Sequence, residues 1–307
     1  MFGTKKVITV TTFLKIIPLL MLGFAVMDPS STFGYFMLIA FLLGIGGGDF
    51  SSYMPSTSLF FPKKELGTAL GVQAGIGNFG VSLVQLLSPL IIGLSIFSFM
   101  GGGEIIAETG KTIYLENIAF IYIIPLFLVG IWAWFSLKSI PVVASFKEQM
   151  GTFAGMAAAF PMMIKSLYVP LENDLDPLKF AFYGPLIGSA TRVFFGKIAD
   201  KTGGAILTHI TGIALIILFS VLIFGGFLTP TTIDQFSYFV GIVMLIFFFT
   251  GIGNAATFKQ FPMIFSDSPR KAAGVIGWTA AIAAFGPFVF NVLISTSKSI
   301  SGDARLF

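Results

Sequence analysis

The sequence contains no cysteine and only one histidine, His209. Without cysteine, the chain cannot form a disulfide bond, a thiolate nucleophile or a cysteine-ligated metal site. A single histidine near the start of an apolar run does not by itself make a proton relay or a metal site. No nucleophile with a neighbouring base stands out either. The sequence therefore predicts a protein that is not an enzyme and that holds neither a metal ion nor a cofactor.

Charged residues are also scarce. They make up 10% of the 307 residues, against roughly 25% in an average soluble domain, while hydrophobic residues make up 55% and the mean hydropathy is +0.93. Because the apolar runs are continuous and do not alternate at every second residue, they favour helices over membrane β-strands. Nine of them approach the roughly 17–25 residues that a membrane-spanning helix needs: 7–27, 32–55, 68–99, 117–137, 150–168, 178–199, 205–228, 236–262 and 272–295. We therefore expect an all-α, polytopic membrane protein surrounded by a lipid bilayer.

The basic residues in the loops and near the ends of the runs are divided unevenly between alternate loops. Five fall on one side, at Lys111, Lys165, Lys179, Lys298 and Arg305. Eleven fall on the other, at Lys5, Lys6, Lys63, Lys64, Lys138, Lys147, Lys197, Lys201, Lys259, Arg270 and Lys271. Because cytoplasmic loops carry the excess of Lys and Arg, this pattern predicts nine crossings of the cell's inner (plasma) membrane, with a cytoplasmic N-terminus. Topology then explains the net charge of +4, and nucleic acid is not an expected partner.

Two Gly-rich segments, 44–80 and 251–288, form an internal repeat. The alignment pairs Gly71 with Gly277, an offset of 206 residues, and each copy places a short basic loop between two helical runs. Many transporters consist of duplicated halves with the substrate between them. The repeat therefore predicts two related halves.

The offset also predicts helices outside this sequence. The helix that carries Arg192 would have its partner before Met1, and the run at 117–137 would have its partner beyond Phe307. We therefore expect a parent protein of twelve helices. This sequence would contain about nine of them and would be shortened at both ends. The expected organisation is an incomplete N-terminal half (1–140), a shortened central cytoplasmic loop (141–149) and an incomplete C-terminal half (150–307).

Arg192 lies in the middle of the apolar run 178–199. An arginine at the centre of a membrane helix costs roughly 2.5–3.5 kcal/mol, and it cannot avoid that cost by losing its proton. It must therefore face a partner or a water-filled cavity, and its planar fork suits two oxygens of a small trigonal anion. The alternative is a structural ion pair with Asp49, the acidic residue deep in another apolar run. Lys15 lies nearer a helix start, where its long stem can snorkel.

The segment "GKIADKTGG" begins at Gly196 and contains Asp200, Lys201 and Gly203. This spacing resembles the inter-helix loop motif of the major facilitator superfamily, G-x-x-x-D-R-x-G. The resemblance implies a helical bundle of the major-facilitator type. It also implies that the acidic and basic residues clamp a cytoplasmic gate.

The segment "GIGNFG" at 75–80 matches the G-x-G-x-x-G spacing of dinucleotide sites, but no strand precedes it and no acidic residue follows about 20 positions later. Glycines in a membrane helix either let another helix approach closely or expose backbone to a ligand, and the sequence leaves both readings open. An asparagine among such glycines, here Asn78, can offer its amide NH₂ group to an anion.

The longer segments "GGGDF…FFPKKELGTALGVQAGIGNFGVSLVQ" and "GIGNAATF…AAGVIGWTAAIAAFGPF" resemble the two signature regions of the nitrate/nitrite porter family. The resemblance implies that the signature helices line the pathway and that an arginine from each half grips the anion. Arg192 is then the second-half arginine, and Asn78 the signature asparagine beside the substrate. Other residues that the resemblance places on the pathway are Gly75, Gly77, Gly253, Asn254 and, in an aromatic wall, Phe153.

Three departures from the family pattern bear on function. We expect the helix of the first-half arginine to be absent and the early turns of the seventh helix to be missing from "ASFKEQMGTFAG". Ala283 and Pro287 stand where the family often has glycine. We expect a nitrate/nitrite transporter that works by alternating access, with proton coupling or exchange of the two anions left open. The alternatives are a shortened membrane protein that does not transport and a major-facilitator carrier for another small anion.

Overall fold

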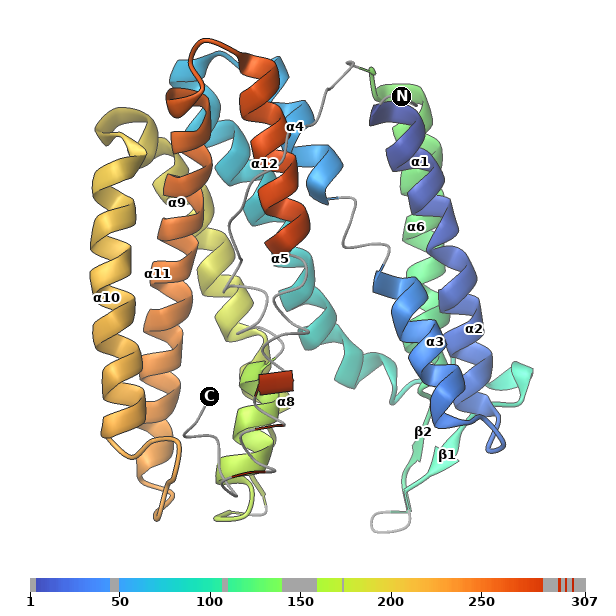
Figure 1. Ribbon diagram of the computed structural model, residues 1–307. Coiled ribbons are helices and arrows are strands. Elements are labelled where there is room, and N and C mark those ends of the chain that lie inside the picture. The colour runs from blue at the N-terminus through green and yellow to red at the C-terminus, as the bar shows by residue number, and fades with distance from the viewer. Residues whose placement is uncertain are drawn as a thin grey trace. The chain divides into compact units, whose positions relative to one another are not determined.

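The structure is a computed structural model, and it describes residues 4–44, 50–106, 110–139, 159–172 and 174–283, with a few isolated positions beyond 291. The chain divides into two compact units (Figure 1). Unit 1 comprises Met1–Ser56 and Leu87–Val142, and unit 2 comprises Thr57–Leu86 and Val143–Phe307. The predicted central loop at 141–149 lies outside the described residues. The division into halves at 1–140 and 150–307 therefore stays a prediction.

Unit 1 is built from apolar helices and one small hairpin. Its helices are α1 (Thr4–Leu14), α2 (Ile16–Met27), α3 (Phe33–Gly44), the start of α4 (Phe50–Phe60), the end of α5 (Leu66–Ile91) and α6 (Glu116–Ser136). The hairpin pairs β1 (Glu104–Ile105) with β2 (Thr112–Ile113) in antiparallel fashion, after a 3₁₀ turn, η3 (Ser98–Met100). Within the described ranges this hairpin is the only sheet, so the expected all-α class is confirmed.

Helices α1 and α2 together form one membrane-length segment, Thr4–Met27, interrupted at Lys15. Pro18 explains the interruption, because it lacks the N–H that would bond to the carbonyl one turn earlier. Helix α6 packs against both segments. Two glycines make this packing close, since a side chain at Gly23 would overlap the ring of Phe120 and one at Gly130 would overlap that of Phe13.

Unit 2 is centred on its longest helix, α11 (Gln235–Ile264), which packs against α9 (Tyr183–Thr202) and α10 (Gly204–Phe224). The remaining elements are η2 (Lys63–Glu65), most of α5, a π-helical turn (Ile164–Tyr168), α8 (Leu178–Ala181) and α12 (Pro269–Ala283). The buried core contains Phe160, Phe239 and Phe247, together with Tyr168, whose hydroxyl donates to the Phe227 carbonyl at 3.0 Å.

The helices match most of the predicted spans. Five are long and apolar enough to cross a membrane: Thr4–Met27, Lys63–Ile91, Glu116–Ser136, Gly204–Phe224 and Gln235–Ile264. Helix α9 has the length but carries Arg192, Lys197, Asp200 and Lys201. The runs at 32–55, 150–168 and 272–295 are described only in part, so nine crossings stay a prediction.

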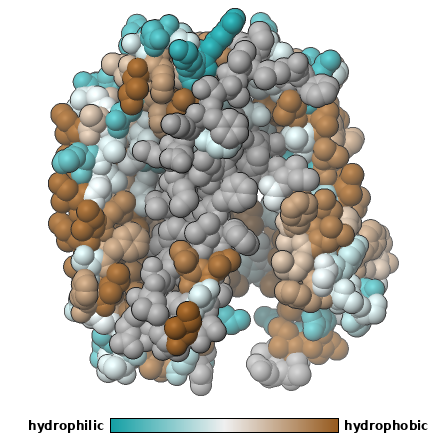
Figure 2. All heavy atoms as spheres, viewed as in Figure 1, coloured by the Kyte–Doolittle hydropathy of each residue, from teal (hydrophilic) through white to brown (hydrophobic). Residues whose placement is uncertain are grey.

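The surface of α10 is largely apolar. Figure 2 shows hydrophobic residues over the flank where α10 lies. The exposed large hydrophobic side chains on this helix are Ile206, Ile210, Ile213, Ile216, Ile217, Val221 and Phe224. An exposed face of this size and composition is what lipid tails cover in a membrane helix.

Candidate functional site

The candidate site begins with a row of glycines on α5. Gly67, Gly71 and Gly75 are spaced by four residues, so they share one face of the helix. A Cβ atom at Gly71 would lie 2.7 Å from the carbonyl oxygen of Arg192, and one at Gly75 would lie 2.8 Å from that of Ser189. The backbones of α5 and α9 therefore approach each other without intervening side chains.

Arg192 lies on α9 beside this row and is 2% exposed. Its Nη1 donates to the carbonyl oxygen of Ala74 at 3.3 Å. The Asn78 side chain, one turn further along α5, meets the same guanidinium. Because a guanidinium has only donors, the Asn78 amide oxygen faces it, and accepts from Nη1 and, at 3.3 Å, from Nη2. The structure thus brings together Arg192 and Asn78, the two residues that the sequence analysis predicts to bind the anion.

In these contacts the Ala74 carbonyl and the Asn78 amide oxygen are neutral acceptors. Asp49, the alternative ion-pair partner, lies outside the described residues, and that alternative is untested. Phe153 of the predicted aromatic wall also lies outside them.

The other predicted pathway residues have different surroundings. Gly75 packs against α9, whereas no described heavy atom lies within 4 Å of a Cβ built at Gly77. Gly253 packs against α10, since its Cβ would lie 2.7 Å from the methyl carbon of Thr211. Asn254 is half-buried, and its amide oxygen has no hydrogen-bond partner among the described residues. Gly75 and Gly253 therefore serve close helix packing, and a backbone exposed to a ligand at Gly77 stays a prediction.

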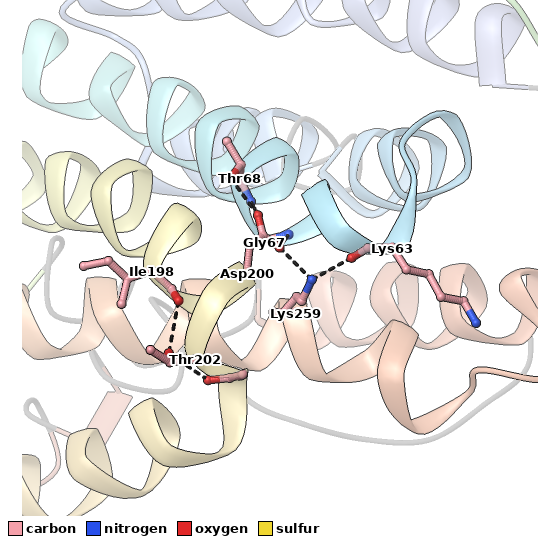
Figure 3. A network of polar contacts seen from close by, with 8 residues as sticks. Lys63, Gly67, Thr68, Ile198, Asp200, Thr202 and Lys259 are labelled. Atoms are coloured by element: carbon pink, nitrogen blue, oxygen red, sulfur yellow. Dashed lines mark hydrogen bonds and ion pairs between the residues drawn. The ribbon is translucent and has the colours of Figure 1, made fainter.

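A second cluster joins the end of α9 to the start of α5 (Figure 3). The Asp200 carboxylate accepts from the backbone N–H groups of Gly67, at 2.8 Å, and Thr68, at 2.6 Å, and from the Thr68 hydroxyl at 2.6 Å. The first N–H groups of a helix have no partner inside the helix, and its N-terminus favours negative charge. Asp200 therefore caps α5 from a neighbouring helix.

Lys259 of α11 completes this cluster. Its Nζ forms an ion pair with Asp200 at 2.6 Å, with side-chain exposures of 5% and 9%, and donates to the Lys63 carbonyl at 2.6 Å. The loop motif predicts Lys201 as the basic residue of the gate, but Lys201 is exposed, and the charge pattern includes Lys259 only for the membrane topology. The position of Lys259 at the end of an apolar run was the available signal, but its partner depends on helix packing.

The two glycines of the loop motif have separate structural causes. A Cβ at Gly196 would lie 2.5 Å from the carbonyl oxygen of Gly67, so this glycine allows the helix contact. Gly203 follows the end of α9 with φ +81, a conformation that L side chains rarely adopt. It lets the chain turn directly into α10.

Comparisons with known proteins agree with this architecture. Residues 1–291 match the family model of the Major Facilitator Superfamily. The chain is 45% identical to a probable nitrate/nitrite antiporter, NarK2, of Thermus thermophilus, over 99% of this chain and 73% of that protein. It is 34% identical to the nitrate/nitrite transporter NarU of Salmonella typhimurium, again over 99% and 73%.

A solved structure is similar to this chain, and the similarity concerns the fold alone. A bacterial homologue of the iron transporter ferroportin, crystallised in an outward-facing state, matches with a TM-score of 0.59 and 13% identity. The match covers 99% of this chain and 78% of that one.

Proposed function

The chain belongs to the nitrate/nitrite porter family of the major facilitator superfamily, and from this premise we propose that it carries nitrate or nitrite across the inner membrane by alternating access. Membership makes it an integral membrane transporter and not an enzyme. The two relatives named above are described as nitrate/nitrite carriers, which supports a small inorganic anion as the substrate.

The observation that carries the proposal is the buried pair of Arg192 and Asn78. An amide whose oxygen accepts from the guanidinium keeps its two N–H donors for another acceptor. An anion next to this pair would receive hydrogen bonds from both side chains and would be attracted by the charge of the guanidinium. A planar anion with two accessible oxygens matches the guanidinium fork best, and nitrate and nitrite both meet that condition.

The cluster around Asp200 is the gate that we assign to this transporter. It ties the first turn of α5 to α9 and α11 through charge-assisted hydrogen bonds, which are the stronger kind. With the predicted orientation, the cluster lies at the cytoplasmic end. Alternating access requires one end of the pathway to open while the other closes, and we assign to this cluster the role of holding the cytoplasmic end closed.

Uptake into proteoliposomes tests the proposal. The purified chain should accumulate labelled nitrate faster than empty liposomes, and nitrite should compete while larger anions such as sulfate should not. Internal nitrite should accelerate uptake if the two anions exchange, and an imposed pH gradient should do so if protons are coupled. A well-folded chain without uptake would instead favour a protein that does not transport, and selective uptake of another anion would favour a carrier with a different substrate.

A further inference from the structure

Unit 1 contains a cavity of about 240 Å³ beside the β1–β2 hairpin. Its wall combines the end of α2, the loop before β1 and the start of α6. The residues that matter for its chemistry are Gly101, Gly102, Gly103, Glu104 and Glu116. None of them takes part in the anion site, which lies in unit 2.

Glu116, the first residue of α6, is the unusual member of this wall. It is 2% exposed, and its Oε1 atom accepts no hydrogen bond from any described residue. Gly102 packs directly on this carboxylate, and a side chain at that position would overlap Oε1. A buried carboxylate oxygen that accepts no hydrogen bond is costly, so a cation bound at this oxygen would lower the free energy of the site.

Two features of the same wall bear on its charge. The N-terminus of α6, where Glu116 lies, contributes the equivalent of about half a positive charge, which is less than the charge of one carboxylate. The exposed carboxylate of Glu104 adds a second negative charge to the wall.

We propose that this cavity binds a hydrated divalent cation, Ca²⁺, through Glu116 and Glu104. Two carboxylates match the charge of a divalent ion, and carboxylate oxygens are ligands that hard cations prefer. At ~30 Å³ for each water, the cavity has room for the ion and several waters. Ca²⁺ tolerates such irregular, partly hydrated coordination better than Mg²⁺ does.

Ca²⁺ binding to the purified full chain in detergent tests this site. Calorimetric titration at constant ionic strength should give saturable binding with a Kd on the order of 10⁻⁴–10⁻³ M, as in other sites with few charged ligands. At a free Ca²⁺ concentration ten times that Kd, the melting temperature of the protein should rise by roughly 2–4 °C. Glu116→Gln keeps the shape and removes the charge, and should weaken binding at least tenfold.

Two further variants keep the test decisive if Glu116→Gln does not fold. Glu104→Gln changes an exposed side chain and should also weaken binding. Gly102→Ala should displace the Glu116 carboxylate, whereas the control Gly34→Ala adds a methyl group where no described atom lies within 4 Å. Glu65→Gln, an exposed carboxylate of unit 2, should leave binding unchanged.

The proposal is wrong if no saturable Ca²⁺ binding occurs, or if the Kd is the same in Glu104→Gln and Gly102→Ala as in the unmodified chain. It is also wrong if Na⁺ at matched ionic strength produces the same rise in melting temperature, because the effect would then be screening. Neither result depends on nitrate transport, so the site is judged separately from the proposed function.

Discussion

Asp200 and Arg192 lie on one helix only eight residues apart, yet their surroundings differ in kind. Asp200 has a full set of protein partners, including the charged Nζ of Lys259 and two backbone N–H groups of α5. The contacts described for Arg192, from Ala74 and Asn78, are neutral acceptors. The ion pair of Asp200 suits a structural or gating role, and the fork-shaped guanidinium of Arg192 beside the Asn78 amide suits a small planar anion.

The Asp200–Lys259 pair gives a prediction at the scale of one residue. Breaking a buried ion pair by removing one partner costs about 3–5 kcal/mol, so Lys259→Met should lower the melting temperature clearly. Lys201→Met removes an exposed lysine from the same loop and should change it little. Thermal unfolding of the two purified variants measures the difference. Equal melting temperatures would show that the pair does not hold these helices together.

At the scale of elements, the glycine row of α5 determines how closely α9 can approach. Only some of the α5 glycines face that helix: Gly71 does, whereas a Cβ at Gly80 would meet no described atom within 4 Å. The same residue type therefore has opposite consequences on two faces of one helix.

We expect Gly71→Ala and Gly80→Ala to change stability in opposite directions. The first forces a methyl group against the Arg192 carbonyl and should destabilise the protein by roughly 1–3 kcal/mol, the usual cost of overpacking. The second replaces glycine in an open helical position and should stabilise it by about 0.5–1 kcal/mol. Melting curves of both variants decide the matter, and a stabilising Gly71→Ala would contradict the close packing described here.

The individual elements show how much the sequence could predict. The run at 117–137 became α6 at Glu116–Ser136, because a continuous apolar stretch between charged residues leaves little freedom in its ends. The run at 68–99 was predicted too long, since α5 ends at Ile91. There the Asn117 amide donates to the Ile91 carbonyl at 3.0 Å and holds the following loop. Such a contact between distant residues is not visible in hydropathy.

The candidate site shows the same limit. Arg192 stood out because a charge in an apolar run is expensive, and Asn78 because it lies in a recognisable signature. Lys259 did not stand out, since its importance comes from the packing of α9, α11 and the start of α5 around one carboxylate. Sequence therefore indicated the residues that are anomalous by themselves, and the structure was needed for those that matter through a neighbour.

At the scale of the whole molecule, the absence of cysteine makes the predicted orientation simple to test. The excess of basic residues places the α9–α10 loop in the cytoplasm and the β1–β2 hairpin outside. Single-cysteine variants therefore have no background from native thiols. A membrane-impermeant thiol reagent added to intact cells should label Thr112→Cys and spare Lys201→Cys, both of which change exposed positions. The reverse pattern would invert the topology.

Transport by this protein requires the anion to bind where Arg192 and Asn78 meet. The dissociation constant of nitrate for the purified chain, measured by calorimetry, tests this most directly. Arg192→Lys keeps the charge but loses the fork, and Asn78→Asp places a competing carboxylate against the guanidinium. We predict that each variant weakens nitrate binding at least tenfold while Lys197→Arg, an exposed change on the same helix, leaves it unaltered. Nitrate affinity that is unchanged in both Arg192→Lys and Asn78→Asp would contradict the proposed site.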